Sequence, residues 1–164
     1  MTSKQFPLSY YAQDALELAP ALLGQYLARR WPDGHISWFT ITETEAYRGE
    51  EDKGCHCSKG RTPRTEMMYE EGGHIYIYLI YGMHWMLNVV SGPAEHPQAI
   101  LIRGLQEVRG PGRLTKKLQI DRSWHGKHID QTNGLWIAPS GKTPSYSALS
   151  RIGIDYAGAY WANR

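Results

Sequence analysis

Residues 75–90 read Ile-Tyr-Ile-Tyr-Leu-Ile-Tyr-Gly-Met-His-Trp-Met-Leu-Asn-Val-Val, and this stretch decides the fold class. Residues 75–81 and 83–90 are two apolar runs of strand length, and Gly82 between them permits a tight turn. We therefore expect a β-hairpin. A large Tyr81 at its tip is costly in water unless the ring inserts into something, although it could also pack on its own sheet.

A second hairpin is expected nearer the start of the chain. Residues 25–31 and 36–47 have the composition of strands, and Pro32-Asp33-Gly34 between them is a strong turn signal. Before them, Asp14 can cap a helix over residues 15–23, with Gly24 as its stop.

The remaining segments complete the expected architecture. Residues 48–73 are rich in glycine and charge and predict an irregular loop, while residues 100–105 and 135–138 predict two short strands. Gly110-Pro111-Gly112 precedes a short helix in which Leu114 and Leu118 share one face. Strands outnumber helices and hairpins join them, so we expect an α+β fold: a single domain with a curved, mostly antiparallel β-sheet core flanked by short helices.

Length and composition exclude several classes of protein. The chain has 164 residues, 41% hydrophobic and 21% charged, which is typical of one globular domain and excludes a disordered chain. No apolar run reaches the ~18 residues of a membrane span, and the first residues lack the apolar segment of a signal peptide. Cys55 and Cys57 are too few and too close for a disulfide framework, so we expect a reducing, intracellular environment.

Two compositional features point toward a ligand. The chain has eleven Tyr and six Trp but only two Phe, and rings with a polar group suit surfaces that touch a ligand, although many will be core. Between Arg103 and His128, seven Lys and Arg stand against two Asp and Glu. This stretch is a candidate surface for a polyanion such as nucleic acid, although basic surfaces also serve solubility alone.

The segment Phe39 to Tyr47 is the first candidate for chemistry. Side chains alternate along a strand, so Phe39, Ile41, Glu43, Glu45 and Tyr47 should share one face. A carboxylate among apolar and aromatic neighbours either gains a hydrogen-bond partner or has its pKa raised by desolvation, and both outcomes suit a general acid or base. The alternative is a strand that emerges into solvent with both carboxylates exposed.

Cys55-His56-Cys57 is a weak metal-binding candidate. Consecutive residues cannot readily present three side chains to one ion, and no second ligand cluster occurs elsewhere in the sequence. We favour a hydrogen-bonding or stacking role for His56.

Several motifs occur together in a fixed order: Glu43-Thr44-Glu45-Ala46-Tyr47, Glu51-Asp52, His56, Ile80-Tyr81-Gly82-Met83, Leu87-Asn88-Val89 and Gly110-Pro111-Gly112-Arg113-Leu114-Thr115. In their order and spacing they resemble the alkyladenine (3-methyladenine) DNA glycosylase family, from about Leu16 to Gly158. The resemblance implies a DNA repair enzyme that excises alkylated purines from double-stranded DNA, with deaminated and etheno purines as further candidates. The chain stops at Arg164, where family members usually continue through a terminal strand, so we expect one domain over residues 1–164 without that strand.

The resemblance also implies a monomer without cofactor, metal, membrane or obligate protein partner. Its expected location is the cytoplasm and nucleoid of a prokaryote or the nucleus of a eukaryote.

The resemblance assigns roles residue by residue. Glu45 matches the general base that activates the attacking water, while Arg103 and the backbone carbonyl of Ile152 match groups that hold this water. The matches to the base-binding slot are Tyr47 on one side, His56 and Tyr78 on the other, and Asn88, which excludes guanine. Tyr81 matches the wedge that fills the gap in the duplex. The matches to DNA-backbone contacts are Arg61, Thr62, Met83, Arg113 and Lys116.

The implied scheme is physically coherent. A base inside a duplex cannot be reached, so it must be extruded into a pocket. Purines alkylated at ring nitrogens are cationic, so electron-rich rings attract them, and they are good leaving groups for which one carboxylate can suffice. No lysine lies in the pocket motifs to form a Schiff base, which favours a monofunctional enzyme that leaves an abasic site.

Two alternatives stay open. In an inverting carbohydrate glycosidase, Glu43 and Glu45 would sit about 6.5–7 Å apart at the backbone. The basic stretch argues against this reading, because a neutral sugar needs no positive field. The second alternative is a catalytically silent module that binds damaged DNA, and the presence of Glu45 argues against it.

Overall fold

A computed structural model of the chain describes residues 4–151 and shows a six-stranded sheet at its centre. The strand order is β3-β4-β5-β2-β1-β6, and each neighbouring pair is antiparallel, which confirms the expected α+β class. The strands are β1 (Tyr26–Arg30), β2 (Ile36–Arg48), β3 (Ile75–Ile80), β4 (His84–Val90), β5 (Gln98–Leu105) and β6 (Leu135–Ala138). The helices are α1 (Ala15–Ala21) and α2 (Pro111–Leu118), with 3₁₀ turns η1 (Leu8–Ala12), η2 (His56–Lys59), η3 (Glu66–Tyr69) and η4 (Arg122–Trp124).

Local sequence signals explain where α1 begins. The Asp14 carboxylate accepts a hydrogen bond from the Leu16 backbone N–H at 2.9 Å, which is the expected N-cap. Leu18 and Ala19 face the core, and α1 ends at Ala21, soon after Pro20, somewhat earlier than predicted. The cap therefore fixes where the helix begins.

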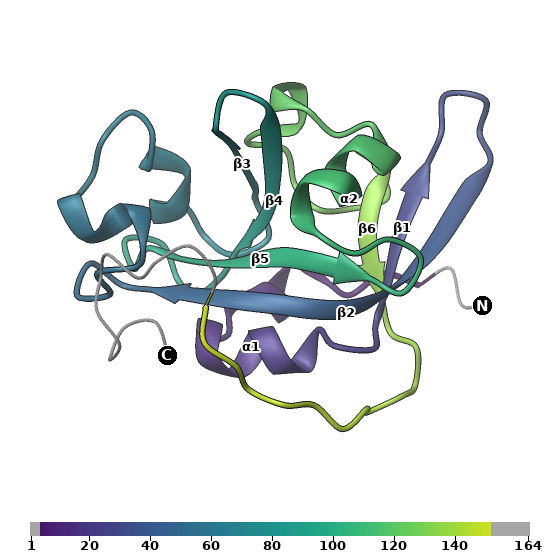
Figure 1. The fold of residues 1–164 in the computed structure, drawn as a ribbon, viewed down its shortest axis with the longest axis horizontal. Helices are drawn as coiled ribbons and strands as arrows, with labels where there is room; N and C mark the ends of the chain where they lie inside the picture. Colours follow the sequence, from purple (N-terminus) through teal and green to yellow (C-terminus); the bar gives the residue numbers. More distant parts are fainter. Residues whose placement is uncertain (1–3, 152–164) are drawn as a thin grey trace.

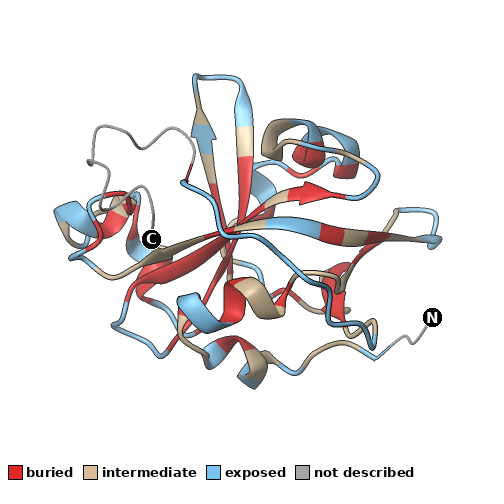
Figure 2. Cartoon of the chain, turned by 60° about the horizontal axis from the view of Figure 1, so that its bottom comes forward, coloured by how far each residue is buried: buried red, intermediate tan, exposed pale blue. Residues whose placement is uncertain are grey.

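The two helices cover opposite sides of the long strands. In Figure 1, α1 lies below β2, and α2 lies above β5. Leu18 of α1 and Leu114 and Leu118 of α2 are fully buried with Leu87 and Ile100 of the sheet, which confirms the shared face predicted for α2. Figure 2 shows the same arrangement, with buried residues along the centre of the sheet and exposed residues at the hairpin ends.

The β3–β4 hairpin creates the wall of a cleft. It rises steeply from β2 and β5 in Figure 1 and stands beside the loop segment that carries η2 and η3. At the hairpin's other side, the Thr115 hydroxyl of α2 donates to the Trp85 carbonyl of β4 at 2.8 Å. The hairpin is thus held at β4 by α2 and along β3 by residues 125–127, and its tip at Tyr81 is exposed. Among residues 4–151, no helix has the length and apolar character needed to cross a membrane.

Candidate active site

A cleft of about 850 Å³ lies between the β3–β4 hairpin, the ends of β2 and β5, and the start of α2. Seven residues with expected roles in catalysis, base binding or intercalation line it: Glu45, Tyr47, His56, Tyr78, Tyr81, Asn88 and Arg103. Arg113 also lines the cleft. Side chains from distant parts of the chain therefore meet around one concave space of the size that small-molecule sites have.

Glu45 is a buried carboxylate with two ordered partners. Its side chain is 8% exposed, and its Oε2 accepts a hydrogen bond from the Tyr47 hydroxyl at 2.7 Å. The Arg103 guanidinium lies on the other oxygen, with Nη1 3.4 Å from Oε1. Burial, followed by the charge of Glu45, raises the pKa of Tyr47, so this hydroxyl stays a donor at neutral pH. The carboxylate is thus fixed at the cleft wall.

A β-bulge separates Glu43 from Glu45. The register between β2 and β5 shifts on both sides of Glu43, so the strict alternation expected along the strand breaks there. The Glu43 side chain is 50% exposed and does not line the cleft, whereas Glu45 and Tyr47 do. The bulge nevertheless leaves both carboxylates beside one guanidinium, with Arg103 3.8 Å from Glu43 and 3.4 Å from Glu45, and among the described residues Glu45 is the carboxylate that lines the cleft.

Aromatic rings form the inner walls. The rings of His56 and Tyr78 meet edge to face with centroids 4.5 Å apart, and His56 Nδ1 lies 3.4 Å from the Tyr76 hydroxyl. Burial, aided by the charge of Arg64, lowers the pKa of His56 to about 4. The imidazole is therefore neutral at physiological pH, and the walls around Tyr47, His56 and Tyr78 carry no charge of their own.

Asn88 lies on the buried part of β4. Its Nδ2 donates to the backbone carbonyls of Tyr76 and Met86 at 3.3 and 3.4 Å. Both contacts fix the orientation of the amide, so Asn88 presents a set edge to the cleft.

Tyr81 stands at the tip of the β3–β4 hairpin in an unusual conformation. Its side chain is 85% exposed, and Met83 beside it is 68% exposed. Tyr81 has a φ of +52°, a left-handed conformation that costs a non-glycine residue about 1–2 kcal/mol. Gly82 follows at +64°, so both central residues have the sign of a type I′ turn. An exposed ring on a strained turn is consistent with a contact outside the chain, and the alternative that Tyr81 packs on its own sheet is wrong.

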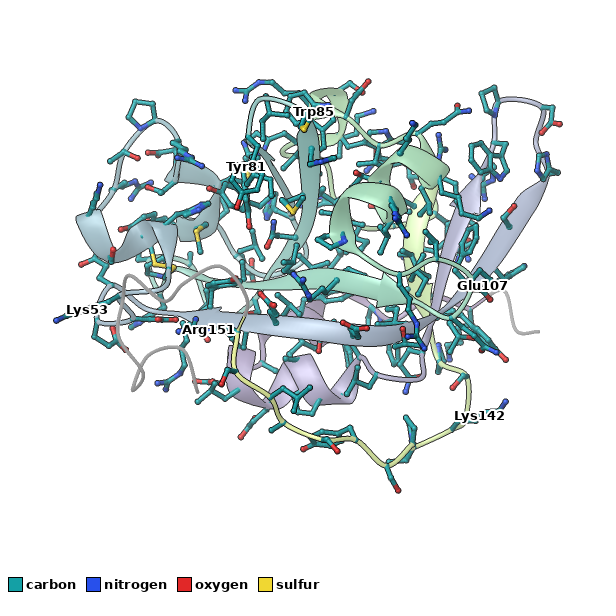
Figure 3. The ribbon with its side chains drawn as sticks, in the orientation of Figure 1. Lys53, Tyr81, Trp85, Glu107, Lys142 and Arg151 are labelled. Atoms are coloured by element: carbon teal, nitrogen blue, oxygen red, sulfur yellow. A yellow bond between two sulfur atoms is a disulfide. The ribbon has the colours of Figure 1, made fainter. Side chains whose placement is uncertain are left out.

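Asp52 and Arg151 form a buried clasp next to Glu45 and Tyr47. Both nitrogens of the Arg151 fork lie 2.8 Å from the Asp52 oxygens, and Nη1 also donates to the Ala46 carbonyl at 3.1 Å. The guanidinium carbon lies 5.0 Å from the centroid of the Tyr47 ring. Figure 3 places Arg151 where the last described segment passes β2. The clasp thus fixes the backbone between the two cleft residues.

The residues expected at the DNA backbone have different surroundings. Arg113 and Lys116 are exposed on α2, and Met83 is exposed on the hairpin. Arg61 instead forms ion pairs with Glu66 and Glu95, at 2.8 and 2.7 Å, away from the cleft. Thr62 takes part in a turn in which its backbone N–H donates to the Thr65 hydroxyl. Ile152 lies outside the described residues.

Cys55 and Cys57 are joined by a disulfide, contrary to the sequence expectation. The 3₁₀ turn that starts at His56 brings their Cα atoms to 5.2 Å, which is within the range that a disulfide spans. Within residues 4–151, no group of three or more His, Cys, Asp or Glu side chains is arranged to hold a metal ion.

Three of the cleft-associated residues without a role assigned from the sequence carry charge that bears on the site: Arg64, Asp52 and Arg151. Arg64 lines the cleft, and Asp52 and Arg151 form the clasp. Arg64 lies in the irregular loop, where no periodicity indicates which way a side chain points. Asp52 and Arg151 are 99 residues apart, and only long-range structure brings them together.

Comparison with known proteins places the chain in a family. The methylpurine-DNA glycosylase family matches residues 9–110 and 106–164. A protein of Psychrobacter cryohalolentis is 42% identical over 92% of this chain and 84% of its own length, and one of Myxococcus xanthus is 43% identical over 95% and 84%. One of the archaeon Methanocella arvoryzae is 37% identical over 93% and 86%. All three bear the provisional name 3-methyladenine DNA glycosylase. The chain belongs to the methylpurine-DNA glycosylase family.

Proposed function

We propose that this chain removes alkylated purines from double-stranded DNA with a single carboxylate, Glu45, as general base. Membership of the family makes it a DNA glycosylase, a hydrolase of N-glycosyl bonds that acts in DNA repair. Glu45 accepts a proton from water, and the water oxygen bonds to C1′ of the damaged nucleotide. The N-glycosidic bond breaks, and its electron pair neutralises the cationic purine as it leaves. The product is an intact abasic site.

The observation that carries this proposal is the fixed, buried carboxylate at the wall of an aromatic cleft. The Tyr47 hydroxyl and the Arg103 guanidinium hold Glu45 from two sides, which leaves its orientation set before a substrate arrives. Orientation in advance is what general-base catalysis requires, because the base must lie within hydrogen-bond reach of the water. Arg103 supports the same step by holding Glu45 rather than by accepting the proton.

The cleft suits a purine extruded from the duplex. Tyr47, His56 and Tyr78 line it as the expected stacking walls, and base–aromatic stacking is worth about 1–3 kcal/mol per base. The neutral imidazole of His56 does not repel a cationic purine. The fixed amide of Asn88 is suited to crowd the 2-amino group that distinguishes guanine. Tyr81 can enter the gap that the extruded base leaves, which recovers part of the cost of opening the pair.

The start of α2 supports a contact with the DNA backbone. Gly110, Pro111 and Gly112 line the cleft where the helix begins, and free N–H groups at a helix N-terminus favour phosphate. Arg113 and Lys116 add exposed positive charge to the same helix. Arg61 is a weaker candidate for this role, because its charge is shared with Glu66 and Glu95.

An inverting glycosidase receives no support from this geometry. That reaction needs two carboxyl groups that face one bond. Glu43 does not line the cleft, so Glu45 has no carboxylate partner there among the described residues.

Glu45→Gln tests the proposal directly. A positioned general base contributes about 10²–10⁴-fold, so single-turnover excision of 7-methylguanine from a duplex should fall by that factor. Capture of a duplex that carries fluorescent 1,N6-ethenoadenine should persist. Glu43→Gln is the control on the same strand, since Glu43 lies outside the cleft but also contacts Arg103, and it should lose far less activity than Glu45→Gln. Near-normal excision by Glu45→Gln, or an equal loss in the control, would contradict the assignment of Glu45 as the general base.

A further inference from the structure

Among the described residues, four arginines line the cleft (Arg64, Arg103, Arg109 and Arg113), and Arg64 is the one that lies over a ring of the proposed stacking walls. It lines the cleft from the loop before η3, and its guanidinium carbon lies 5.9 Å from the centroid of the Tyr78 ring. Within residues 4–151, no carboxylate forms an ion pair with it. Its positive charge is therefore directed at the same ring that the proposed function offers to the flipped base.

The charge of Arg64 acts on several of the rings that line the cleft. The charge of Arg64 lowers the pKa of His56, in addition to the larger effect of burial. It also acts to lower the pKa values of Tyr76 and Tyr78, although burial raises both overall. A positive potential that disfavours a proton on His56 disfavours any other cation held between these rings.

We propose that Arg64 is a specificity-determining residue that shifts the preference of the slot from cationic toward neutral purine lesions. The inference rests on the proposed function, because it assumes that flipped purines stack between these rings. A permanently alkylated purine such as 7-methylguanine carries a positive charge into the slot and is repelled by Arg64. An etheno or deaminated purine is neutral and is not. The aromatic walls attract cations, and Arg64 offsets part of that attraction.

Arg61 supplies a matched control on the same loop. Its guanidinium also lies over a tyrosine ring, 5.0 Å from the centroid of Tyr69, but it is paired with Glu66 and Glu95 and does not line the cleft. Arg61→Gln and Arg64→Gln therefore remove the same charge from the same loop at different places. Arg64→Lys keeps the charge while changing the shape.

A competition experiment measures the preference between cationic and neutral lesions as one ratio of affinities. Each variant is made in the Glu45→Gln background, so that bound lesions are not excised. A duplex with fluorescent 1,N6-ethenoadenine is bound first and displaced with a duplex that carries 7-methylguanine, and with an undamaged duplex as baseline. Two charges about 8 Å apart in a partly solvated site interact strongly enough to change affinity by about threefold to tenfold.

We expect the 7-methylguanine duplex to displace the ethenoadenine duplex from Arg64→Gln at a concentration about threefold to tenfold lower than from the parent. Each concentration is first divided by the concentration of undamaged duplex that gives the same displacement. Arg64→Lys and Arg61→Gln should match the parent. An unchanged ratio in Arg64→Gln, or an equal shift in Arg61→Gln, overturns the inference. If Arg64 only contacts phosphate, Arg64→Gln weakens all three duplexes alike and leaves the ratio unchanged, which also overturns it. If the parent binds neither lesion better than undamaged DNA, the proposed function fails instead.

Discussion

Arginine and aromatic side chains meet in two regions of this molecule, and the regions differ in what the arginine contacts. Near β1 and β6, Arg29 lies between Trp31 and Trp124, 4.8 and 4.6 Å from the ring centroids, and its Nε donates to the Leu118 carbonyl. Arg29 is buried there. Arg30 lies 5.2 Å from the centroid of Trp136 and donates to the Gln131 carbonyl. We call the two sides of this sheet edge together the tryptophan cluster: Trp31 and Trp124 lie with Arg29, and Trp38 and Trp136 lie with Arg30.

The cleft uses the same residue types around an open space. Arg64 is exposed and lies above Tyr78, and the neighbouring rings border a volume of about 850 Å³. In the tryptophan cluster the guanidiniums are satisfied by carbonyls and rings of the chain itself. The contrast teaches that aromatic and basic composition alone does not mark a site. The informative difference is whether the rings pack on one another or face a space.

Trp136→Ala should produce the largest effect and should separate stability from chemistry. Trp136 is 1% exposed and packs edge to face with Trp38 at 5.9 Å, so its loss leaves a large cavity. We expect the free energy of unfolding to fall by about 3–5 kcal/mol. Denaturant melts measure this loss, and excision per folded molecule should stay at the wild-type rate. Trp136→Phe is the milder control. A large drop in the excision rate of folded Trp136→Ala would contradict the proposal that the tryptophan cluster supports stability and the cleft supports catalysis.

The folded protein should lose stability in acid because of His56 in the cleft, and the tryptophan cluster should not contribute to this loss. The pKa of His56 is about 4 in the folded chain, below its ordinary value of 6.5, chiefly because of burial. Below pH 6.5 the unfolded chain therefore binds more protons, so stability falls from about pH 6.5 down to pH 4, by up to about 3 kcal/mol.

His56→Asn should remove most of that slope, and unfolding curves at pH 7, 5.5 and 4.5 measure it. His125, whose pKa burial also lowers, accounts for a remaining part. Trp136→Phe should keep the full slope. An unchanged slope in His56→Asn contradicts the assignment of the acid sensitivity to the cleft.

Tyr81→Ala gives the smallest expected effect on the folded chain and sharpens the comparison of the two hairpins. The β1–β2 turn covers its aromatic residue, because Trp31 stacks on His35 at 5.9 Å, whereas the β3–β4 turn exposes Tyr81. Removing an exposed ring should hardly change the melting temperature. Excision should fall several-fold on matched duplexes, less on mismatched ones, and least on single strands, because extrusion costs less there. Equal losses on all three substrates would show that Tyr81 is not a wedge.

Most of the fold follows from local sequence patterns. Strands of alternating or continuous apolar residues, the turn at Pro32-Asp33-Gly34, and the Asp14 cap each carry their information within a few residues. The expected elements therefore occur close to their expected bounds, for example β6 at Leu135–Ala138. The bulge at Glu43 was not predictable, because it depends on how β2 pairs with β5 and not on either sequence alone.

The residues of the candidate site fall into the same two groups, those predictable from local sequence and those that depend on long-range structure. Glu45, Tyr47 and Tyr78 lie on strands, where spacing tells which side chains share a face. The family resemblance named them, and the structure brings them to one cleft. Arg64 and the disulfide lie in the irregular loop, and the partnership of Asp52 with Arg151 depends on contacts across nearly the whole chain. Such features require the folded backbone before they can be seen.

The Asp52–Arg151 clasp has a consequence for the order in which the protein is made. During synthesis, residues 26–105 supply five of the six strands, yet Arg151 emerges much later. Until then Asp52 has no arginine fork, and closing a contact over 99 residues costs chain entropy that the other contacts must already offset. Until then the arginine contact to the Ala46 carbonyl, between Glu45 and Tyr47, is missing. A nascent chain can build its sheet on the ribosome well before it acquires the fixed geometry of its catalytic strand.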